Sequence, residues 1–199
     1  KAQAGEMGSR LYAVGVKTPQ GLKFELPLKA DLEAITAAGA DLFRNRSRWE
    51  KENVIPGEKY PEVSSDPRPR LYGMPRWADM FSPRQLLGMG TLVEELRGLR
   101  QEISDKEGPD QGAAVEHLLA FAIDKFLNYN AVLASWHAPH EVMRSVFDRH
   151  DFAFKVTFAE MAPCGAGSGL AWAIDNTMDS WDKLARLARA SSVAPATIS

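Results

Sequence analysis

The stretch RLYGMPRWADMFSPRQLL, residues 70–87, contains the start of a long helix in its second half. Ser82 is a residue type that accepts hydrogen bonds from the free backbone N–H groups at a helix start, and Pro83 suits the first helical position. Apolar residues then recur at helical spacing as far as Ser104. We therefore expect a helix over residues 83–104.

The residues before this helix mix large apolar and charged side chains, in a pattern that fits neither a plain strand nor a plain helix. We expect Trp77, Met80 and Phe81 to be buried against the helix, with Asp79 accepting hydrogen bonds nearby. The segment would then be a structural corner that anchors the helix. The residues assigned to this motif are Tyr72, Trp77, Asp79, Phe81, Pro83 and Gln85.

Upstream, the sequence predicts a β-hairpin, a helix and a loop. Residues 10–17 and 22–28 have strand-like patterns, and TPQG at 18–21 can reverse the chain between them. Residues 29–53 change to helical spacing. Residues 54–70 contain four prolines and no apolar period, which predicts a loop longer than most.

Downstream, residues 105–110 (DKEGPD) break the first long helix. A second long helix is expected over 111–134, antiparallel to the first because the connection is short. A short helix is expected over 140–149, then a strand over 152–158, where phenylalanines and a valine alternate with other residues. A final helix is expected over 170–190.

These elements predict an α+β fold that is mostly α. A small antiparallel sheet, made of the N-terminal hairpin and the later strand, would lie beside a bundle of about four helices. The expected parts are a hairpin and helix (1–53), a Pro-rich loop and aromatic corner (54–82), a helical region with one strand (83–190) and a tail (191–199). We expect one compact domain, and we interpret the chain as a fragment of a larger protein.

Composition and charge narrow the class of protein. The 199 residues are 45% hydrophobic and 25% charged, which is typical of a folded soluble protein, and no apolar run approaches the ~20 residues of a membrane helix. The single cysteine, Cys164, excludes an internal disulfide and favours a cytoplasmic setting. Residues 1–84 carry 14 Lys and Arg against 11 Asp and Glu, or +3, whereas residues 85–199 carry 10 against 15, or −5. A polyanion would therefore contact the first part. We expect no membrane partner.

The arginines Arg68, Arg70, Arg76 and Arg84 are candidates for contacts with DNA phosphates, because two aromatic residues that could stack on bases lie among them. The alternative is an ordinary surface of salt bridges, since carboxylates are interspersed. The wider basic set adds Arg44, Arg46, Arg48 and Lys51, and the interspersed carboxylates are Glu50, Glu52, Glu58, Glu62, Asp66 and Asp79.

Three glycines, Gly165, Gly167 and Gly169, lie between a predicted strand and a predicted helix, as in loops that bind a phosphate or the carboxylate of S-adenosylmethionine. Four residues, MAPC, intervene where such a loop needs a tight turn, and no acidic residue follows on a second parallel strand. We therefore favour a connector over a cofactor loop.

Two further groups of polar residues have the composition of a binding site. His137, His140, His150 and Cys164 have side chains that bind metals, but they fall on different predicted elements, so we assign no metal site.

Asp124 and Asn128, with Lys125 and Asn130 beside them, are four residues apart on the second long helix, as a hydrogen-bonded pair would be. This group either binds another element of the same protein or is a solvated edge.

The chain also resembles a known family. YGMPRWADMFSPRQLL (72–87) is similar to the Y-G-x-x-x-[WF]-x-D-[LM]-F-[ST]-P-R-Q-L-L segment of the large bacterial and archaeal adenine-specific DNA methylases with an inserted zinc ribbon. GEMGSRLYAV (5–14) resembles their G-x-M-G-x-x-L-Y-A-V stretch. AIDKFLNYNAVLASW (122–136) resembles D-[RK]-x-x-[DN]-x-N-x-x-x-x-x-W. VFDRHDFAFKVTFAEMAPCGAGSGLAWAID (146–175) resembles a segment that contains F-A-E-x-x-P.

The resemblance implies a place within a larger enzyme. Family members transfer a methyl group from S-adenosylmethionine to the exocyclic amine of adenine, using a D-P-F-x-G-x-G cofactor motif and a D-P-P-Y catalytic motif. Neither motif occurs in these residues. The chain therefore resembles the insert between them, which implies no catalytic, cofactor-binding or metal-binding residue here, and S-adenosylmethionine as the cofactor of the full-length protein.

Two roles follow for such an insert. It could recognise the DNA target, with weak DNA binding in isolation, or it could be a structural bracket that holds the two catalytic halves or a partner subunit. A DNA-reading face should gather the four candidate arginines without carboxylates between them, whereas a bracket should expose apolar side chains. A stand-alone enzyme that uses Cys164 or the histidines is a third, less favoured alternative.

Overall fold

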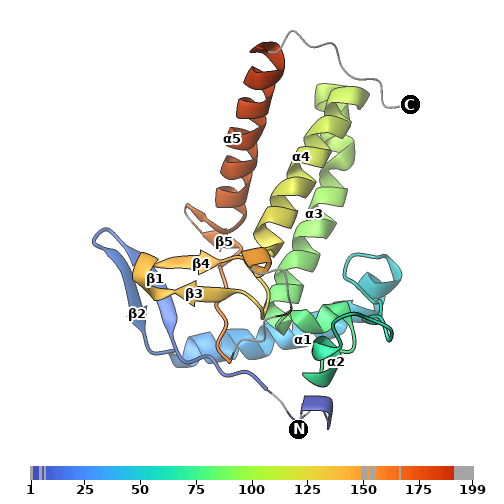
Figure 1. Ribbon diagram of the computed structural model, residues 1–199. Coiled ribbons are helices and arrows are strands. Elements are labelled where there is room, and N and C mark those ends of the chain that lie inside the picture. Colours follow the sequence, from blue (N-terminus) through green and yellow to red (C-terminus); the bar gives the residue numbers. More distant parts are fainter. Residues whose placement is uncertain are drawn as a thin grey trace. The chain divides into compact units, whose positions relative to one another are not determined.

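The computed structural model describes residues 2–4, 6, 8–148, 152, 156–165 and 167–190 (Figure 1). The chain divides into two compact units. The first unit combines residues 1–94 with 127–160, and the second combines 95–126 with 161–199. Each unit is therefore built from two separate stretches of sequence, and we describe each by itself.

The first unit begins with a short 3₁₀ turn, η1 (Ala2–Ala4), followed by the predicted β-hairpin. Strands β1 (Val14–Thr18) and β2 (Gly21–Glu25) pair antiparallel, with Thr18 opposite Gly21. The Thr18 hydroxyl donates to the Gly21 carbonyl at 2.8 Å, and Gly21 has a φ of 123°, which favours glycine. The TPQG reversal therefore lies where the sequence places it.

Helix α1 (Lys29–Lys51) follows directly and supplies two residues of the core. Its start is fixed by Asp31, whose Oδ2 accepts a hydrogen bond from the Leu28 N–H at 2.7 Å. Leu42 and Trp49 are buried on one face of the helix. This helix confirms the prediction for residues 29–53 to within two residues at its end.

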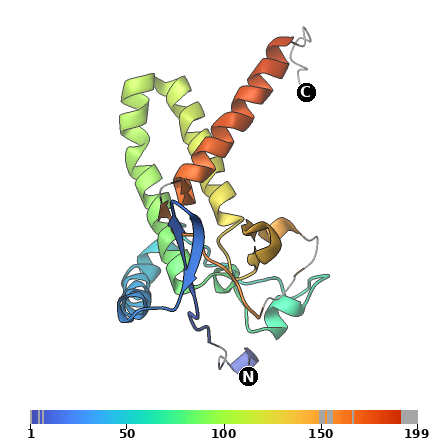
Figure 2. The same ribbon diagram turned by 90° about the vertical axis from the view of Figure 1, so that its left-hand side faces the viewer.

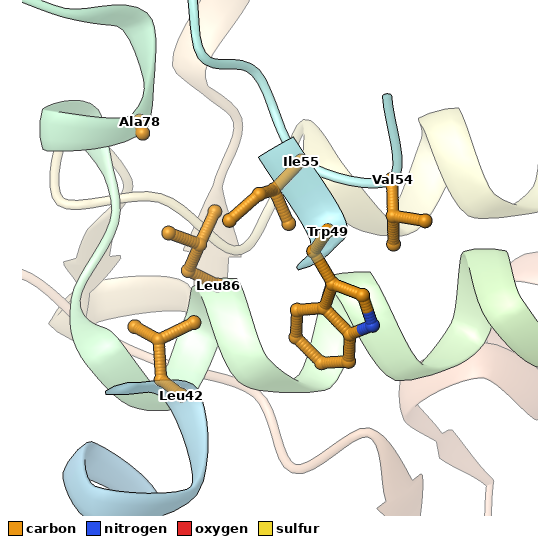
Figure 3. Packing of buried hydrophobic residues seen from close by; sticks show 6 residues of the cluster. All are labelled: Leu42, Trp49, Val54, Ile55, Ala78 and Leu86. Atoms are coloured by element: carbon orange, nitrogen blue, oxygen red, sulfur yellow. The ribbon is translucent and has the colours of Figure 1, made fainter. Parts of the chain in front are cut away.

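The core of the first unit forms around the Trp49 indole, which is only 1% exposed (Figure 3). Side chains from α1, from the loop after it, from the η2 turn (Trp77–Met80) and from the start of helix α3 (Pro83–Glu107) form the buried cluster with this ring. Gly90 gives the ring room, because a Cβ at this position would lie 2.5 Å from Trp49 Cζ3. The buried cluster consists of Leu42, Trp49, Val54, Ile55, Ala78 and Leu86.

The segment that leads into the next long helix has two short helical turns, α2 (Arg68–Leu71) and η2 (Trp77–Met80). Helix α3 (Pro83–Glu107) then begins with Pro83 at its first position, as predicted. The Ser82 hydroxyl accepts the Gln85 N–H at 3.2 Å, and the Gln85 Oε1 accepts the Ser82 N–H at 2.9 Å. This reciprocal pair is a capping box and confirms Ser82 as the cap.

The structure contains a second β-hairpin that the sequence did not predict. Strands β3 (Ser135–His137) and β4 (Val142–Arg144) pair antiparallel around the 3₁₀ turn η3 (Ala138–His140). Another 3₁₀ turn, η4 (Val146–Asp148), follows. The short helix predicted over 140–149 is therefore wrong: three-residue strands carry too little periodicity to be recognised from sequence.

The two hairpins of the first unit contact each other through Phe24 and Trp136, whose ring centroids are 5.4 Å apart in an edge-to-face arrangement. The strand predicted over 152–158 is not formed at the described residues 156–158, where Val156 is 93% exposed. Residues 151 and 153–155 lie outside the described part. Alternation of apolar residues did not produce a strand at 156–158, because in the structure these residues pair with no other strand.

The second unit contains the end of α3, helix α4 (Pro109–Leu127) up to residue 126, the short strand β5 (Cys164–Gly165) and helix α5 (Gly169–Ala190). The end of α3 and α4 run antiparallel side by side in both views (Figures 1 and 2). Gly108 turns the chain with a φ of 81°, and an Arg100–Glu116 salt bridge of 3.0 Å links the helices.

The fold class is confirmed as α+β and mostly α. The described residues form long helices with two small antiparallel sheets of two strands each. Within these residues, none of the helices is both long enough and apolar enough to cross a membrane.

Candidate functional site

The strongest polar constellation of the first unit surrounds the carboxylate of Glu160. The Ser82 hydroxyl donates to Glu160 Oε1 at 2.7 Å, and Arg84 donates to Oε2 through Nε at 2.9 Å. These partners lie 78 and 76 residues from Glu160 in the sequence. The Glu160 side chain is only 19% exposed. The group, which we call the Glu160 clamp, therefore ties the start of α3 to a distant segment through charge-assisted hydrogen bonds.

Gln85 extends the clamp into the interior. Its side chain accepts the Ser82 N–H, and the residue is 2% exposed. Its Nε2 atom has no hydrogen-bond partner among the described residues. Burying an amide donor in this way costs free energy, so the capping geometry and the packing around Gln85 must offset that cost.

Backbone hydrogen bonds attach a third segment, residues 127–136, next to the Glu160 clamp. The Val132 N–H donates to the Met80 carbonyl at 2.9 Å, and the Ala159 N–H donates to the Ala134 carbonyl at 3.3 Å. Ala134 is fully buried. Three separate stretches, 72–87, 127–136 and 158–160, therefore meet in one cluster.

The aromatic corner differs from the prediction. Trp77 is 42% exposed, so its predicted burial is wrong, and its ring packs instead on Tyr60 at 4.9 Å between centroids. The 3₁₀ turn η2 directs the small Ala78 into the core, where it is 2% exposed. Met80 and Phe81 are partly buried, and Phe81 packs against the core cluster.

Asp79 behaves as predicted. Its Oδ2 accepts the Arg76 N–H at 2.8 Å and so caps the η2 turn. Tyr72, at the other end of the corner, is 41% exposed and packs near the Phe152 ring, with 5.9 Å between the centroids. The corner is therefore fixed by its polar and small residues, while its two largest aromatic rings remain at the surface.

Each of the four candidate arginines contacts an acceptor within the chain. Arg68 donates through Nε to Asp66 at 2.7 Å, Arg70 donates to the Glu62 carbonyl at 3.2 Å, and Arg76 lies 3.6 Å from Glu50. Arg84 belongs to the Glu160 clamp. Three of the four therefore lie beside carboxylates.

The Asp66 carboxylate has the most strongly shifted pKa that the structure resolves. The Arg68 guanidinium, by hydrogen bonding, lowers the pKa of Asp66 from 3.8 to about 2, and the backbone N–H groups of Arg68 and Phe152 act in the same direction. Hydrogen bonds to a charged carboxylate favour its ionised form. Asp66 therefore fixes Arg68 and also binds a residue 86 positions away, at Phe152.

The glycine-rich segment forms a tight turn. Cys164 bridges to Gly169, and Gly165 bridges to Ser168. A Cβ at Gly169 would lie 2.2 Å from the Pro163 carbonyl oxygen, and Gly169 has a φ of 63°. Steric requirements of this turn therefore account for the glycine at position 169 without a ligand.

The two described histidines of the candidate metal set, His137 and His140, stack with their ring centroids 4.7 Å apart. His150 lies outside the described residues, and Cys164 is exposed in the second unit. In the part of the chain that the structure describes, no group of three or more His, Cys, Asp or Glu side chains is arranged to hold a metal.

Asn128 follows the last residue of α4 and binds another element of the first unit. Its Oδ1 accepts the Phe147 N–H at 3.2 Å, and its carbonyl accepts the Val146 N–H at 2.8 Å. Asp124, the expected partner on the helix, is exposed. Asn128 therefore attaches the η4 turn to the end of α4, in contacts that do not involve Asp124.

Comparison of the chain with models of protein families, with curated proteins and with solved structures finds no match. Sequence reasoning did not single out Glu160 as a site residue, although it lies in the F-A-E segment that carries part of the resemblance. No pattern within the sequence links Glu160 to Ser82 and Arg84, which lie 78 and 76 residues away. The clamp satisfies both Glu160 oxygens within the chain, so the arrangement favours structural fixation over proton transfer.

Proposed function

We propose that this chain is a non-catalytic structural bracket in an S-adenosylmethionine-dependent DNA adenine methyltransferase. The observation that carries the proposal is the Glu160 clamp. In it the segments 72–87 and 158–160 meet, and their polar side chains form hydrogen bonds with each other. The methyltransferase context comes from the resemblance of the sequence. The bracket would hold the remaining domains of the same polypeptide, or a partner subunit, in the cytoplasm.

The environment of the arginines favours a bracket over a DNA-reading surface. A phosphate that approaches Arg68, Arg76 or Arg84 meets Asp66, Glu50 or Glu160 beside it. A carboxylate next to an arginine repels the phosphate and competes for the same N–H donors.

Exposed apolar side chains on α1 also favour a bracket. Leu32 is 49% exposed and Phe43 is 84% exposed. They are eleven residues apart, which is three turns of helix, so both lie on the same outward face. An outward apolar face is typical of a surface that another domain covers.

DNA recognition remains the second candidate, because one region keeps the side chains that it would need. Arg70 is exposed and donates to the Glu62 carbonyl, and the exposed rings of Tyr72 and Trp77 lie a few residues away. Arginine beside exposed aromatic rings is the composition of a surface that binds nucleic acid by stacking and charge.

Fluorescence anisotropy of a labelled duplex at two salt concentrations separates the two functions. For a bracket, we expect wild type and the Arg68/Arg70/Arg76→Ala variant to bind equally weakly with the same salt slope. The matched control, Lys183/Arg186/Arg189→Ala, removes the same charge from α5. Binding that is lost only in the first variant, with a slope reduced by about 0.9 per lost phosphate contact, would overturn the bracket in favour of DNA recognition.

A further inference from the structure

A pocket of about 600 Å³ lies beside the short helix α2 in the first unit. Pockets of this size, with apolar walls and a few polar groups, are typical of sites for small molecules. Leu71, which forms part of the wall, is 54% exposed and so offers apolar surface that a ligand would cover. We call this site the Arg70 pocket. The residues that line it include Ala2, Gln3, Pro67, Arg70, Leu71 and Pro75.

The backbone around the Arg70 pocket is held in place within the chain. The Tyr60 N–H donates to the Pro75 carbonyl at 2.8 Å. Gly73, which also lines the pocket, has a φ of 81°, and a Cβ at this position would clash with the Ala2 carbonyl oxygen. The glycine therefore lets η1 lie directly against the segment that follows α2. The pocket is thus formed without a ligand, as most small-molecule sites are.

Arg70 is the one charged residue among the described residues that line the pocket. One of its N–H groups donates to the Glu62 carbonyl at 3.2 Å, and a guanidinium has five such donors. In the described part of the chain, no salt bridge joins Arg70 to a carboxylate, whereas the neighbouring Arg68 is paired with Asp66. Arg70 therefore has donors available for a ligand, beside apolar walls.

We propose that the Arg70 pocket binds a small organic carboxylate with an apolar body. The planar fork of a guanidinium matches the two oxygens of a carboxylate, and the prolines and Leu71 would cover the apolar body. One cation balances one negative charge. A phosphate dianion or a polyanion carries more negative charge, in a segment that also contains Glu62 and Asp66, and is therefore disfavoured.

This inference is independent of the proposed function, because it uses neither the Glu160 clamp nor a DNA contact. The exposed rings of Tyr72 and Trp77, which the DNA-binding alternative requires, are not among the described residues that line the pocket. Binding of a small carboxylate is measured without DNA and without a partner domain. Its failure would therefore leave the bracket untouched, and failure of the bracket would leave the pocket untouched.

Titration of the full chain with phenylacetate, followed by two-dimensional NMR of the backbone N–H groups, tests the pocket. We expect saturable shifts that centre on residues 70–73. Two ligands of matched size are the controls: phenylacetamide lacks the charge, and benzylphosphonate is used as a dianion. Both should bind about tenfold more weakly, because a hydrogen bond to a charged group is lost or the excess charge is repelled. Shifts that centre elsewhere, equal binding of the amide, or tighter binding of the phosphonate overturn the proposal.

Substitution of the arginine gives a second, separate test. Arg70→Met keeps the apolar stem and removes the guanidinium, so we expect phenylacetate to bind about tenfold more weakly. Arg44→Met is the matched control: it removes the same charge from an exposed position on α1 and should leave binding unchanged. Equal phenylacetate affinity of Arg70→Met and wild type would overturn the role of Arg70. The comparison of phenylacetate with phenylacetamide uses the wild-type chain, so it does not depend on how either variant folds.

Discussion

Helices α1 and α5 have nearly the same length, 23 and 22 residues, and each carries a tryptophan past its middle, yet the two rings have opposite environments. Trp49 of α1 is 1% exposed, whereas Trp181 of α5 is 50% exposed. Trp49 is covered because Gly90 of α3 provides space for its ring and the loop after α1 folds over it. An amphipathic pattern therefore identifies an apolar face, but it does not determine what covers that face.

Replacing the two tryptophans should give the largest difference between the helices. Trp49→Ala empties a buried aromatic site and should lower the free energy of unfolding by about 3–5 kcal/mol. Trp181→Ala should change it by about 0.5 kcal/mol or less, because the ring is half exposed. Urea unfolding at low protein concentration measures both. Equal losses would show that Trp181 is covered within the same chain.

Filling the space beside Trp49 should have the next largest effect. In Gly90→Ala the new methyl group meets the Trp49 ring, and we expect a net loss of about 1–3 kcal/mol of unfolding free energy. Gly98→Ala in the same helix is the control. No atom lies within 4 Å of a Cβ at Gly98, so this change should instead stabilise α3 by about 0.5–1 kcal/mol. Stabilisation by both substitutions would mean that the Trp49 ring moves freely, contrary to the packing in Figure 3.

Removing the hydroxyl at the start of α3 should have a smaller effect. Ser82→Ala removes the cap of α3 and one hydrogen bond to Glu160, so we expect a loss of about 1–2 kcal/mol in thermal or urea unfolding. Ser180→Ala is the matched change on α5, where the hydroxyl donates to the Asn176 carbonyl in the middle of the exposed helix. That substitution should be neutral or slightly stabilising. A Ser82→Ala variant as stable as wild type would contradict a structural role for the Glu160 clamp.

The smallest effect concerns Asp66 and depends on pH. Its pKa is about 2 in the folded chain and 3.8 in its ordinary state. The ionised form is favoured by folding, so its contribution is complete above pH ~4 and is lost as the pH falls through about 2. Wild type should therefore be more stable than Asp66→Asn at neutral pH, and the difference should vanish between pH ~4 and ~2.

The measurement is urea unfolding of both proteins at several pH values in that window. A difference that persists unchanged at pH 2 would show that Asp66 acts through packing rather than through its charge.

Local sequence determined much of the fold. Ser82 and Pro83 fix the start of α3 through backbone chemistry that acts within four residues, and TPQG fixes the first hairpin in the same way. The long periodic helices α1 and α5 were predicted closely because their apolar residues repeat over several turns. Such features need no information from distant residues.

Local sequence was insufficient where pairing with a distant segment decides the outcome. The β3–β4 hairpin has strands of three residues, and their formation depends on contacts such as that of Trp136 with Phe24. The residues 156–158 alternate as a strand would, but no partner strand pairs with them. Trp77 has the character of a core residue, but the η2 turn directs Ala78 into the core instead.

The sequence by itself determined the start of α3, the bounds of α1 and α5 to within two residues, the first turn and the fold class, whereas the second long helix, expected over 111–134, ends at Leu127. The tertiary structure decided which of those residues meet. Glu160 joins Ser82 and Arg84 only because segments almost 80 residues apart are folded together, and Arg76 lies beside Glu50 only because helix α1 and the aromatic corner are folded together. Hydrogen bonds and salt bridges act over a few ångströms, so pairs between distant segments are fixed by distance in space rather than by distance along the chain.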